Sequence, residues 1–260
     1  MAFLHRMARP LPGAGKMRTE RKCAMKPFVA DVHTHSLASG HAFGTIRELA
    51  ASAAQRGLKL LGVTEHGPGI PGTVEPIYFR NLADAPRSLY GVEMLYGSEV
   101  NILADGALSL DERHLSCLDY GIAGIHGPCY EDAGVVKNTD NVIRCMEHSK
   151  VKLISHPDND YYPLDYPALV AAAKEYNVAL EVNNSSLRKP GMRLNCLENY
   201  RKLAPMCMEQ GVWLIVNSDA HDPEAVGEFS LARRLLAELD ITDALILNTD
   251  LEKLKAFLLN

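Results

Sequence analysis

The feature that most constrains the fold is a run of ligand-type residues, Asp31-Val32-His33-Thr34-His35, which follows a short apolar segment. Residues two apart on a β-strand point to the same face and lie about 6.6 Å apart along it. Two imidazoles placed in this way can converge on one divalent ion. Asp219-Ala220-His221 repeats the spacing near the other end of the chain. Ligand pairs at both ends favour a fold that brings distant strand ends together.

Short apolar runs alternate with helical patterns along the chain. Seven runs are predicted strands, at 28–35, 58–66, 94–103, 120–126, 151–156, 178–183 and 212–219. The main predicted helices lie at 45–56, 139–148, 167–176, 194–210, 223–239 and 250–259. This alternation indicates parallel β/α units. Because ligand-type residues end strand after strand, we expect an α/β fold, a distorted seven-stranded (β/α) barrel similar to a TIM barrel, with its active site at the C-terminal ends of the strands.

The composition favours one globular domain. The net charge of −5 argues against a broadly nucleic-acid-binding surface, and no apolar run approaches the roughly 20 residues of a membrane span. The cysteines form no C-x-x-C pair, which indicates reduced thiols in a cytoplasmic protein. Residues 1–27 are rich in Lys and Arg and lack the apolar region of a signal peptide. We expect a disordered leader there, with a nucleic-acid-binding arm as the alternative, and a single domain at 28–260.

Candidate metal ligands lie at or near most predicted strand ends. They are His33, His35, His41, His66, Glu99, His126, His156, Asp219 and His221. Each one alone also fits a structural role, such as a hydrogen-bonded histidine or a buried ion pair. Together they indicate a metal centre, because buried polar groups without partners cost several kcal/mol each. His114 and His148 lie away from strand ends and are expected at the surface.

The chain resembles the PHP (polymerase and histidinol phosphatase) superfamily, in particular its YcdX-type phosphoesterases. The resemblance rests on Asp31-x-His33-x-His35, Thr64-Glu65-His66-Gly67-Pro68, Gly97-x-Glu99-x-Asn101, Gly124-Ile125-His126, Ile154-Ser155-His156-Pro157, Glu181-Val182-Asn183-Asn184-Ser185-Ser186 and Ser218-Asp219-x-His221. It implies a distorted seven-stranded barrel that holds three divalent transition metal ions. By this resemblance the first ion is held by His33, His35, Glu99 and Asp219, the second by Glu99, His126 and His156, and the third by His41, His66 and His221. Zinc is the first choice for these ligands, with manganese or iron as alternatives.

The expected activity is that of a metal-dependent hydrolase of phosphoric esters, a phosphatase. Three divalent ions, offset by Glu99 and Asp219, leave a charge of about +4, which attracts phosphate. A hydroxide that bridges ions held by these two carboxylates is the expected nucleophile. We expect a small phosphorylated substrate, phosphate as product, and neither a membrane nor a nucleic-acid partner; homo-oligomer formation is left open. The candidate substrate contacts, each of which also fits a surface or turn role, are Arg188, Lys189, Asn184 and Arg80.

Three alternatives to a phosphomonoesterase stay open from the sequence. A PHP-type nuclease would use the same chemistry on phosphodiesters. An amidohydrolase-type enzyme also begins with H-x-H, but usually has an eighth strand and often a lysine ligand. A non-catalytic metal-binding domain is the third.

Asp31 and Glu65 each fit either an acceptor for a ligand histidine N–H or a capping or salt-bridge role.

Overall fold

The computed structural model describes residues 25–189 and 191–260. Most of the leader predicted at 1–27 lies outside the described residues, so that part stays a prediction. Its last residues contact the domain. The backbone N–H of Lys26 donates to Asp243 Oδ2 at 3.0 Å, and Arg233 Nη1 donates to the Met25 carbonyl at 3.0 Å.

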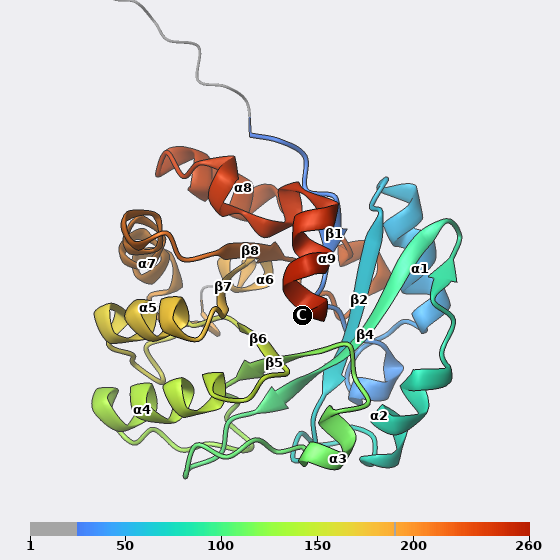
Figure 1. Cartoon of the computed structure of the whole chain (residues 1–260), viewed down its shortest axis with the longest axis horizontal. Helices are drawn as coiled ribbons and strands as arrows, with labels where there is room; N and C mark the ends of the chain where they lie inside the picture. The colour runs from blue at the N-terminus through green and yellow to red at the C-terminus, as the bar shows by residue number, and fades with distance from the viewer. Residues whose placement is uncertain (1–24, 190) are drawn as a thin grey trace, which may run out of the picture.

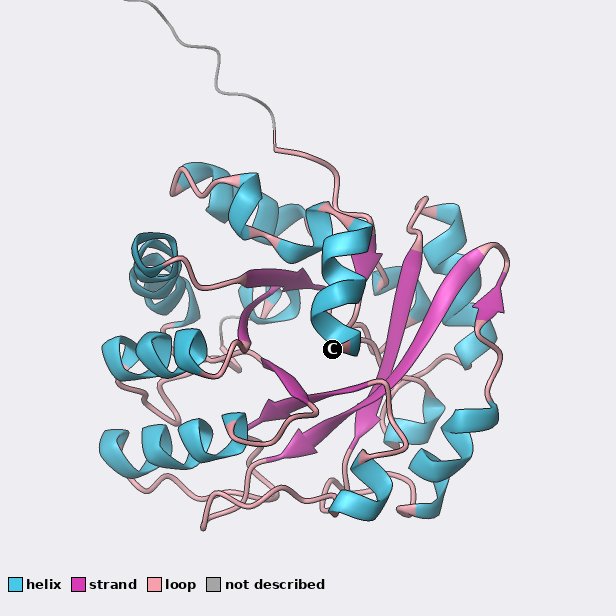
Figure 2. Cartoon of the chain, viewed as in Figure 1, coloured by secondary structure: helices cyan, strands magenta, loops and turns pink. Residues whose placement is uncertain are grey.

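Seven parallel strands form a nearly closed barrel with helices around its outside (Figures 1 and 2). Their order in the sheet is β1 (Ala30–Asp31), β2 (Leu60–His66), β4 (Val92–Asn101), β5 (Tyr120–Gly124), β6 (Val151–Ile154), β7 (Ala179–Asn183) and β8 (Leu214–Asn217). The short strand β3 (Ser88–Leu89) pairs with β4 in antiparallel orientation. The predicted fold class, a TIM-like α/β barrel, is confirmed.

One asparagine joins the first and last strands of the barrel. Asn248 Nδ2 donates to the carbonyls of Ala30 and Val216 at 3.0 and 2.6 Å. Its Oδ1 accepts from the Val216 N–H, and its own carbonyl accepts from the Val29 N–H. Nearer the mouth, Thr34 and Ala220 form an isolated parallel bridge. The amide side chain therefore replaces backbone ladder bonds between β1 and β8.

The helices that cover the barrel lie close to the predicted ranges. The longer ones are α1 (Ile46–Gln55), α4 (Val135–Met146), α5 (Tyr166–Glu175), α7 (Cys196–Gln210), α8 (Ser230–Glu238) and α9 (Leu251–Leu259). Short helices α2 (Ile77–Asn81), α3 (Glu112–Leu115) and α6 (Asn184–Arg188) lie in the connections. Helix α1 begins with a capping box, in which Thr45 and Glu48 satisfy each other's backbone N–H groups.

Two predicted helix boundaries differ from the structure. Helix α4 begins at Val135 rather than at 139, because the Asn138 side chain is buried against Tyr130, Pro163 and the Ala133 N–H instead of capping a later helix. The helix predicted at 223–239 is a 3-10 turn followed by α8. Gly227 separates them with a φ of 73°, a left-handed conformation that favours glycine.

The barrel interior changes from apolar to polar along the strands. At the end where the strands begin, a fully buried cluster includes Leu60, Tyr120, Leu153 and Ile215, and α9 closes this end with Leu254 and Leu258 (Figure 1). The Tyr120 ring fills space left by Gly62, whose Cβ would lie 2.0 Å from the Tyr120 hydroxyl oxygen. Because alternate residues of a strand face the same side, later residues on these strands supply the polar end. We call the apolar end the floor and the polar end the mouth.

The five cysteines in the described part of the chain are free, as their spacing predicts. None of the helices among residues 25–189 and 191–260 combines the length and the apolar character that a membrane crossing requires.

Candidate metal centre

The nine predicted ligands gather at the mouth of the barrel. Glu99 lies on β4 and His66 ends β2, while His126, His156 and Asp219 follow β5, β6 and β8. His33, His35 and His41 lie in the connection after β1, and His221 follows Asp219. Residues from opposite ends of the chain therefore meet, as the barrel topology predicts.

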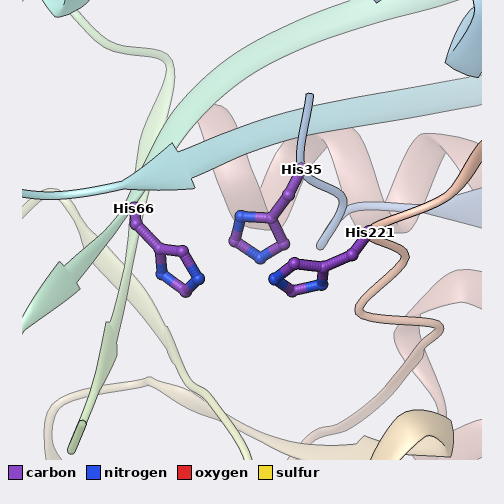
Figure 3. A group of neighbouring side chains, drawn as sticks. All are labelled: His35, His66 and His221. Atoms are coloured by element: carbon purple, nitrogen blue, oxygen red, sulfur yellow. The ribbon is translucent and has the colours of Figure 1, made fainter. Parts of the chain in front are cut away.

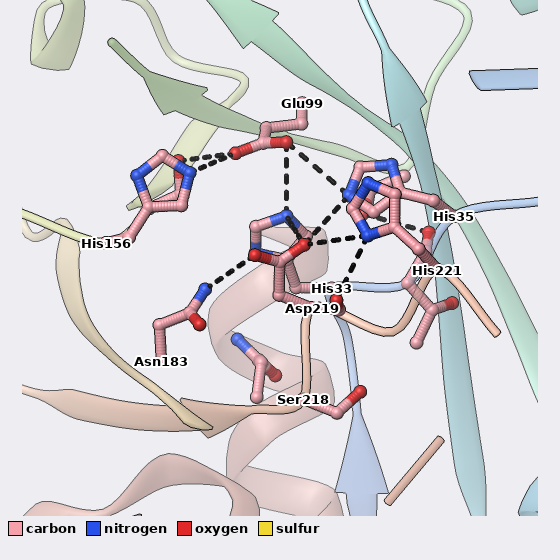
Figure 4. Close-up of polar contacts among 12 residues, drawn as sticks. His33, His35, Glu99, His156, Asn183, Ser218, Asp219 and His221 are labelled. Carbon is pink, nitrogen blue, oxygen red and sulfur yellow. Dashed lines mark hydrogen bonds and ion pairs between the residues drawn. The ribbon is translucent and has the colours of Figure 1, made fainter. Parts of the chain in front are cut away.

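Four ligand atoms surround one point beside Glu99. Glu99 Oε2 lies 3.2 Å from His33 Nε2 and 3.5 Å from His35 Nε2. Asp219 Oδ1 lies 3.7 and 3.4 Å from the same two nitrogens (Figure 4). Ligands of a tetrahedral zinc ion, with bonds of about 2.0–2.2 Å, lie about 3.3–3.6 Å apart. This group therefore has the dimensions of one ion-binding site.

The second oxygen of Glu99 faces a different pair of imidazoles. Glu99 Oε1 lies 3.2 Å from His126 Nε2 and 2.8 Å from His156 Nε2. It also accepts a hydrogen bond from Ser155 Oγ at 2.8 Å. One carboxylate thus separates two sets of nitrogen ligands, which is the arrangement that a bridging ligand requires (Figure 4).

A third set of imidazoles lies nearer the solvent. His41 Nε2 and His221 Nε2 are 3.0 Å apart, and the His66 ring stacks on the His41 ring at 5.0 Å between centroids. The rings of His35, His66 and His221 point toward a shared space in Figure 3. His66 Nδ1 also lies 3.0 Å from Glu99 Oε2, so His66 connects this third set to the carboxylate that the other two sets share.

Several buried ligand atoms at the mouth form no hydrogen bond with any described residue. They are His33 Nε2, His35 Nε2, His66 Nδ1, His126 Nε2 and Glu99 Oε2. Buried polar atoms in folded proteins nearly always have partners, and leaving one unsatisfied costs about 1–3 kcal/mol. Since these atoms face one another at ligand spacing, the donor set fits divalent metal ions.

The opposite ring nitrogens of three ligands have acceptors in place. His33 Nδ1 lies 2.8 Å from Glu181 Oε1, and His126 Nδ1 lies 2.8 Å from Asn101 Oδ1. His35 Nδ1 lies 3.0 Å from Ser39 Oγ, which donates to a carboxylate oxygen of Glu65. An acceptor at Nδ1 keeps the ring hydrogen there and presents the Nε2 lone pair, as a metal requires.

A model of the PHP domain matches residues 31–186 of this chain. The chain belongs to the PHP family. A probable phosphatase of Clostridium acetobutylicum is 38% identical over 232 residues, which cover 89% of this chain and 94% of the relative. A probable phosphatase of Thermoanaerobacter sp. strain X514 is 41% identical over 235 residues, with the same coverage of 89% and 94%. The predicted family and the enzyme class, a phosphatase, are confirmed.

Among solved structures, the fold is similar to that of a histidinol phosphate phosphatase from Lactococcus lactis, which was solved with zinc, L-histidinol and phosphate. The TM-score is 0.57 at 17% sequence identity, over 83% of this chain and 95% of the other. At this identity the likeness supports the barrel architecture alone.

The ionisable groups at the mouth shift one another's pKa values. Burial alone would raise the pKa of Glu99, but His33 and His126 hold it well below its usual range. Burial opposes the charge of Asp219 in the same way, and His33 and His35 likewise lower its pKa. For His33, burial favours the neutral ring, yet Glu181 and Glu99 raise its pKa well above the usual value. For His35, burial together with His66 and His221 lowers the pKa. Both carboxylates are therefore ionised at neutral pH.

The mouth of the barrel opens into a pocket of about 320 Å³, a size typical of small-ligand sites. Besides the ligands, Phe43, Ser185, Ser186 and two cationic side chains, Lys189 and Arg193, line it. A second pocket of about 450 Å³ shares Phe43 and Lys189 with the first and includes Arg188. The structure thus places a pocket of small-ligand size beside both the candidate metal ligands and two cationic side chains.

Two of the predicted substrate contacts lie elsewhere. Asn184 Oδ1 accepts from the backbone N–H groups of Leu231 and Ala232, both at 3.0 Å, and so tethers the start of α8. Arg80 is exposed on α2 and is not a lining residue of either pocket. Lys189 and Arg188 do reach the pockets, so only this half of the predicted set borders the site.

Asp31 and Glu65 are the two acidic candidates for a supporting role, and neither accepts a hydrogen bond directly from a ligand imidazole among the described contacts. Asp31 does not face the imidazoles, because ladder pairing of β1 ends there and its carboxylate accepts from Ser218 Oγ and the Gly227 N–H, at 2.5 and 2.8 Å. Burial raises the pKa of Asp31 to about 6. Among the hydrogen bonds of the described residues, Glu65 reaches a ligand imidazole through Ser39. Of the two roles that the sequence allowed, Asp31 has the capping-type one, and among the described contacts it accepts no N–H from a ligand histidine.

Sequence reasoning missed Glu181 and Arg193 as parts of the site. Glu181 could have been found, because it shares the strand face of Asn183 two residues later, just before the end of β7. Arg193 lies in an irregular segment before α7, where no periodicity predicts the direction of a side chain.

Proposed function

We propose that this PHP-family phosphatase hydrolyses a small phosphate monoester at a centre of three divalent metal ions. The observation that carries the proposal is Glu99, whose two oxygens face two separate sets of imidazole nitrogens, 2.8–3.5 Å away. Such a carboxylate suits a bridge between two ions, as multi-metal hydrolases require.

The ligand sets follow from the distances together with the family resemblance. We assign the first ion to His33, His35, Glu99 and Asp219, and the second to Glu99, His126 and His156. The third ion falls to His41, His66 and His221, of which His41 and His221 already lie 3.0 Å apart. This imidazole-rich set favours zinc, with manganese or iron as alternatives, over magnesium or calcium.

When bound, the ions supply positive charge for the phosphoryl oxygens and lower the pKa of the water that attacks phosphorus. The chain's own residues set up this chemistry. Glu99 and Asp219 hold the ions as ionised ligands, and Glu181 orients the His33 ring through the bond at Nδ1. Lys189 and Arg193 add cationic donors at the pocket wall, where they suit a phosphate dianion.

Substrate size and charge favour a monoester over a polynucleotide. A terminal phosphate brings two negative charges to a centre near +4 and leaves a small alcohol. A polynucleotide must also lie along the protein surface, where a net charge of −5 gives little help. A cytoplasmic location remains our expectation from the reduced cysteines.

The test is a substrate panel on protein of measured metal content. Elemental analysis should give about three transition ions per chain, and kcat/KM should be higher for small phosphomonoesters than for phosphodiesters or oligonucleotides. Inorganic phosphate should inhibit, since it is the expected product. Efficient digestion of oligonucleotides with negligible monoesterase activity would replace this proposal with the nuclease alternative. A single tightly bound ion would overturn the three-ion assignment.

A further inference from the structure

One ligand histidine at the mouth has the opposite hydrogen-bonding arrangement from its neighbours. Arg193 Nη1 lies 2.9 Å from His156 Nδ1. A guanidinium has five N–H donors and no acceptor, so Nδ1 must offer its lone pair to Arg193. The ring hydrogen then lies on His156 Nε2, which is 2.8 Å from Glu99 Oε1 and can donate to it.

The contrast with the other ligands is direct. His33, His35 and His126 each have an oxygen atom at Nδ1, at 2.8, 3.0 and 2.8 Å. In their neutral form, those rings present the Nε2 lone pair toward the ion positions. His156 is buried among the same ligands, but its bond to Arg193 places a hydrogen where the lone pair is needed.

Binding of an ion at His156 and the Arg193–His156 hydrogen bond therefore exclude each other. A metal ion takes the Nε2 lone pair of a neutral imidazole, and the ring hydrogen moves to Nδ1. There it would meet an Arg193 N–H, and two donors cannot bond. Arg193 is half-buried at the wall of the pocket that the ligands line, so its side chain can turn into that space.

A phosphate is the partner that best suits the released guanidinium. Two parallel N–H groups of arginine match two oxygens of a phosphate, and such charge-assisted pairs are stronger than neutral hydrogen bonds. Lys189 lines the same pocket, but among the described contacts no bond joins it to a ligand histidine. Only Arg193 of these two cations contacts both the pocket and the metal ligands.

We propose that Arg193 exchanges its bond to His156 for a bond to the substrate phosphate when an ion binds at His156. The inference rests on the proposed function and adds a coupling to it. Because linkage is reciprocal, phosphate that holds Arg193 away from His156 tightens ion binding at Glu99, His126 and His156. The second ion in turn makes Arg193 available to phosphate.

The experiment compares Arg193→Met with the matched control Lys189→Met, which removes a cation from the same pocket. Zinc affinities are measured by chelator competition without phosphate, and inorganic phosphate affinities are measured by calorimetry on zinc-loaded protein. In Arg193→Met the affinity for the most weakly bound zinc ion should rise about tenfold, because a competing charged hydrogen bond is lost. The affinity for phosphate should fall at least about tenfold. In Lys189→Met only the phosphate affinity should fall, with zinc affinity changed less than about twofold.

Two results would overturn the exchange. Zinc affinity in Arg193→Met equal to or below that of the wild type would show that Arg193 does not compete with the ion. Phosphate affinity equal to that of the wild type would show that Arg193 does not bind phosphate. A crystal structure of the wild type with zinc and phosphate gives a second readout, in which Arg193 should lie about 3 Å from a phosphate oxygen. Failure of the proposed function is a separate result: zinc-loaded wild type would then hydrolyse no monoester, while the zinc titration still tests the competition at His156.

Discussion

The floor and the mouth of the barrel are built from the same strands with opposite kinds of side chain. At the floor, Leu60, Leu153 and Ile215 are fully buried in an apolar cluster. At the mouth, His33, His35 and Glu99 are just as buried, yet each has an atom that forms no hydrogen bond with the described residues. The comparison shows that burial stabilises the fold at one end and, at the other, holds ligand atoms in an arrangement that costs stability until ions bind.

The backbone at the mouth carries a further cost. His156 and Asp219 have positive φ values of 31° and 53°, a region that non-glycine residues rarely adopt. Such conformations cost about 1–3 kcal/mol each and are common at functional sites. Both residues are assigned ligands, so the strain occurs where the chain leaves a strand to direct a side chain toward the ions.

The largest effect is expected at the mouth. Glu99→Gln should reduce the bound metal and lower kcat/KM by at least roughly 100-fold, because a neutral amide cannot bridge two cations. Elemental analysis and a phosphomonoester assay on the same sample measure both effects, and circular dichroism checks folding. Wild-type metal content in this variant would show that the mouth does not depend on the bridging carboxylate.

Leu153→Ala tests the floor. It should lower the free energy of unfolding by about 2–5 kcal/mol, since it leaves a cavity in a fully buried cluster. The metal content of the folded protein should stay at the wild-type value. Denaturant unfolding measures the first quantity and elemental analysis the second. Leu259→Ala is the control, because Leu259 is 48% exposed and should cost less than about 0.5 kcal/mol. Loss of metal in Leu153→Ala would mean that the two ends are not independent.

The pH dependence of metal affinity sharpens the comparison within the mouth. Although burial opposes it, Glu181 and Glu99 raise the pKa of His33, so His33 holds a proton near neutral pH that an incoming ion must displace. Burial, together with His66 and His221, lowers the pKa of His35. Its ring is therefore neutral near neutral pH, and an ion displaces no proton from Nε2. Zinc affinity should therefore rise from about pH 6 to pH 8, by up to about tenfold per pH unit. Chelator competition at several pH values measures this slope, and Glu181→Gln should flatten it. A flat profile in the wild type would refute the assignment to His33.

The smallest effect is expected from the two histidines outside the mouth. His114 Nδ1 lies 2.5 Å from Asp111 Oδ1, and His148 Nε2 lies 2.6 Å from Glu112 Oε2. Both side chains are partly buried, at 15% and 22% exposure, rather than fully at the surface as predicted. Because their carboxylate partners are exposed, each pair contributes little to stability. Substitution of either histidine by alanine should change kcat/KM less than about twofold, and a larger loss would place the residue in the active site.

Much of the fold and of the candidate ligand set could be read from the sequence because the information is local. Alternation with period two defines each strand, and the ligand that follows a strand, such as His66 or His126, appears in the same short segment. Local patterns fail where tertiary contacts override them. Asn138 is one case, because its side chain is buried by distant residues rather than used as a helix cap.

By itself, the sequence predicted the seven barrel strands, the end of the barrel at which the candidate site lies and the nine ligand-type residues found there. Only the tertiary structure decided what each ligand contacts with its other nitrogen. The Glu181 partner of His33 is 148 positions away along the chain, and the Arg193 partner of His156 is 37 positions away. Hydrogen-bond partners depend on distances of about 3 Å, which no spacing within one segment fixes when the partners lie on different strands and loops.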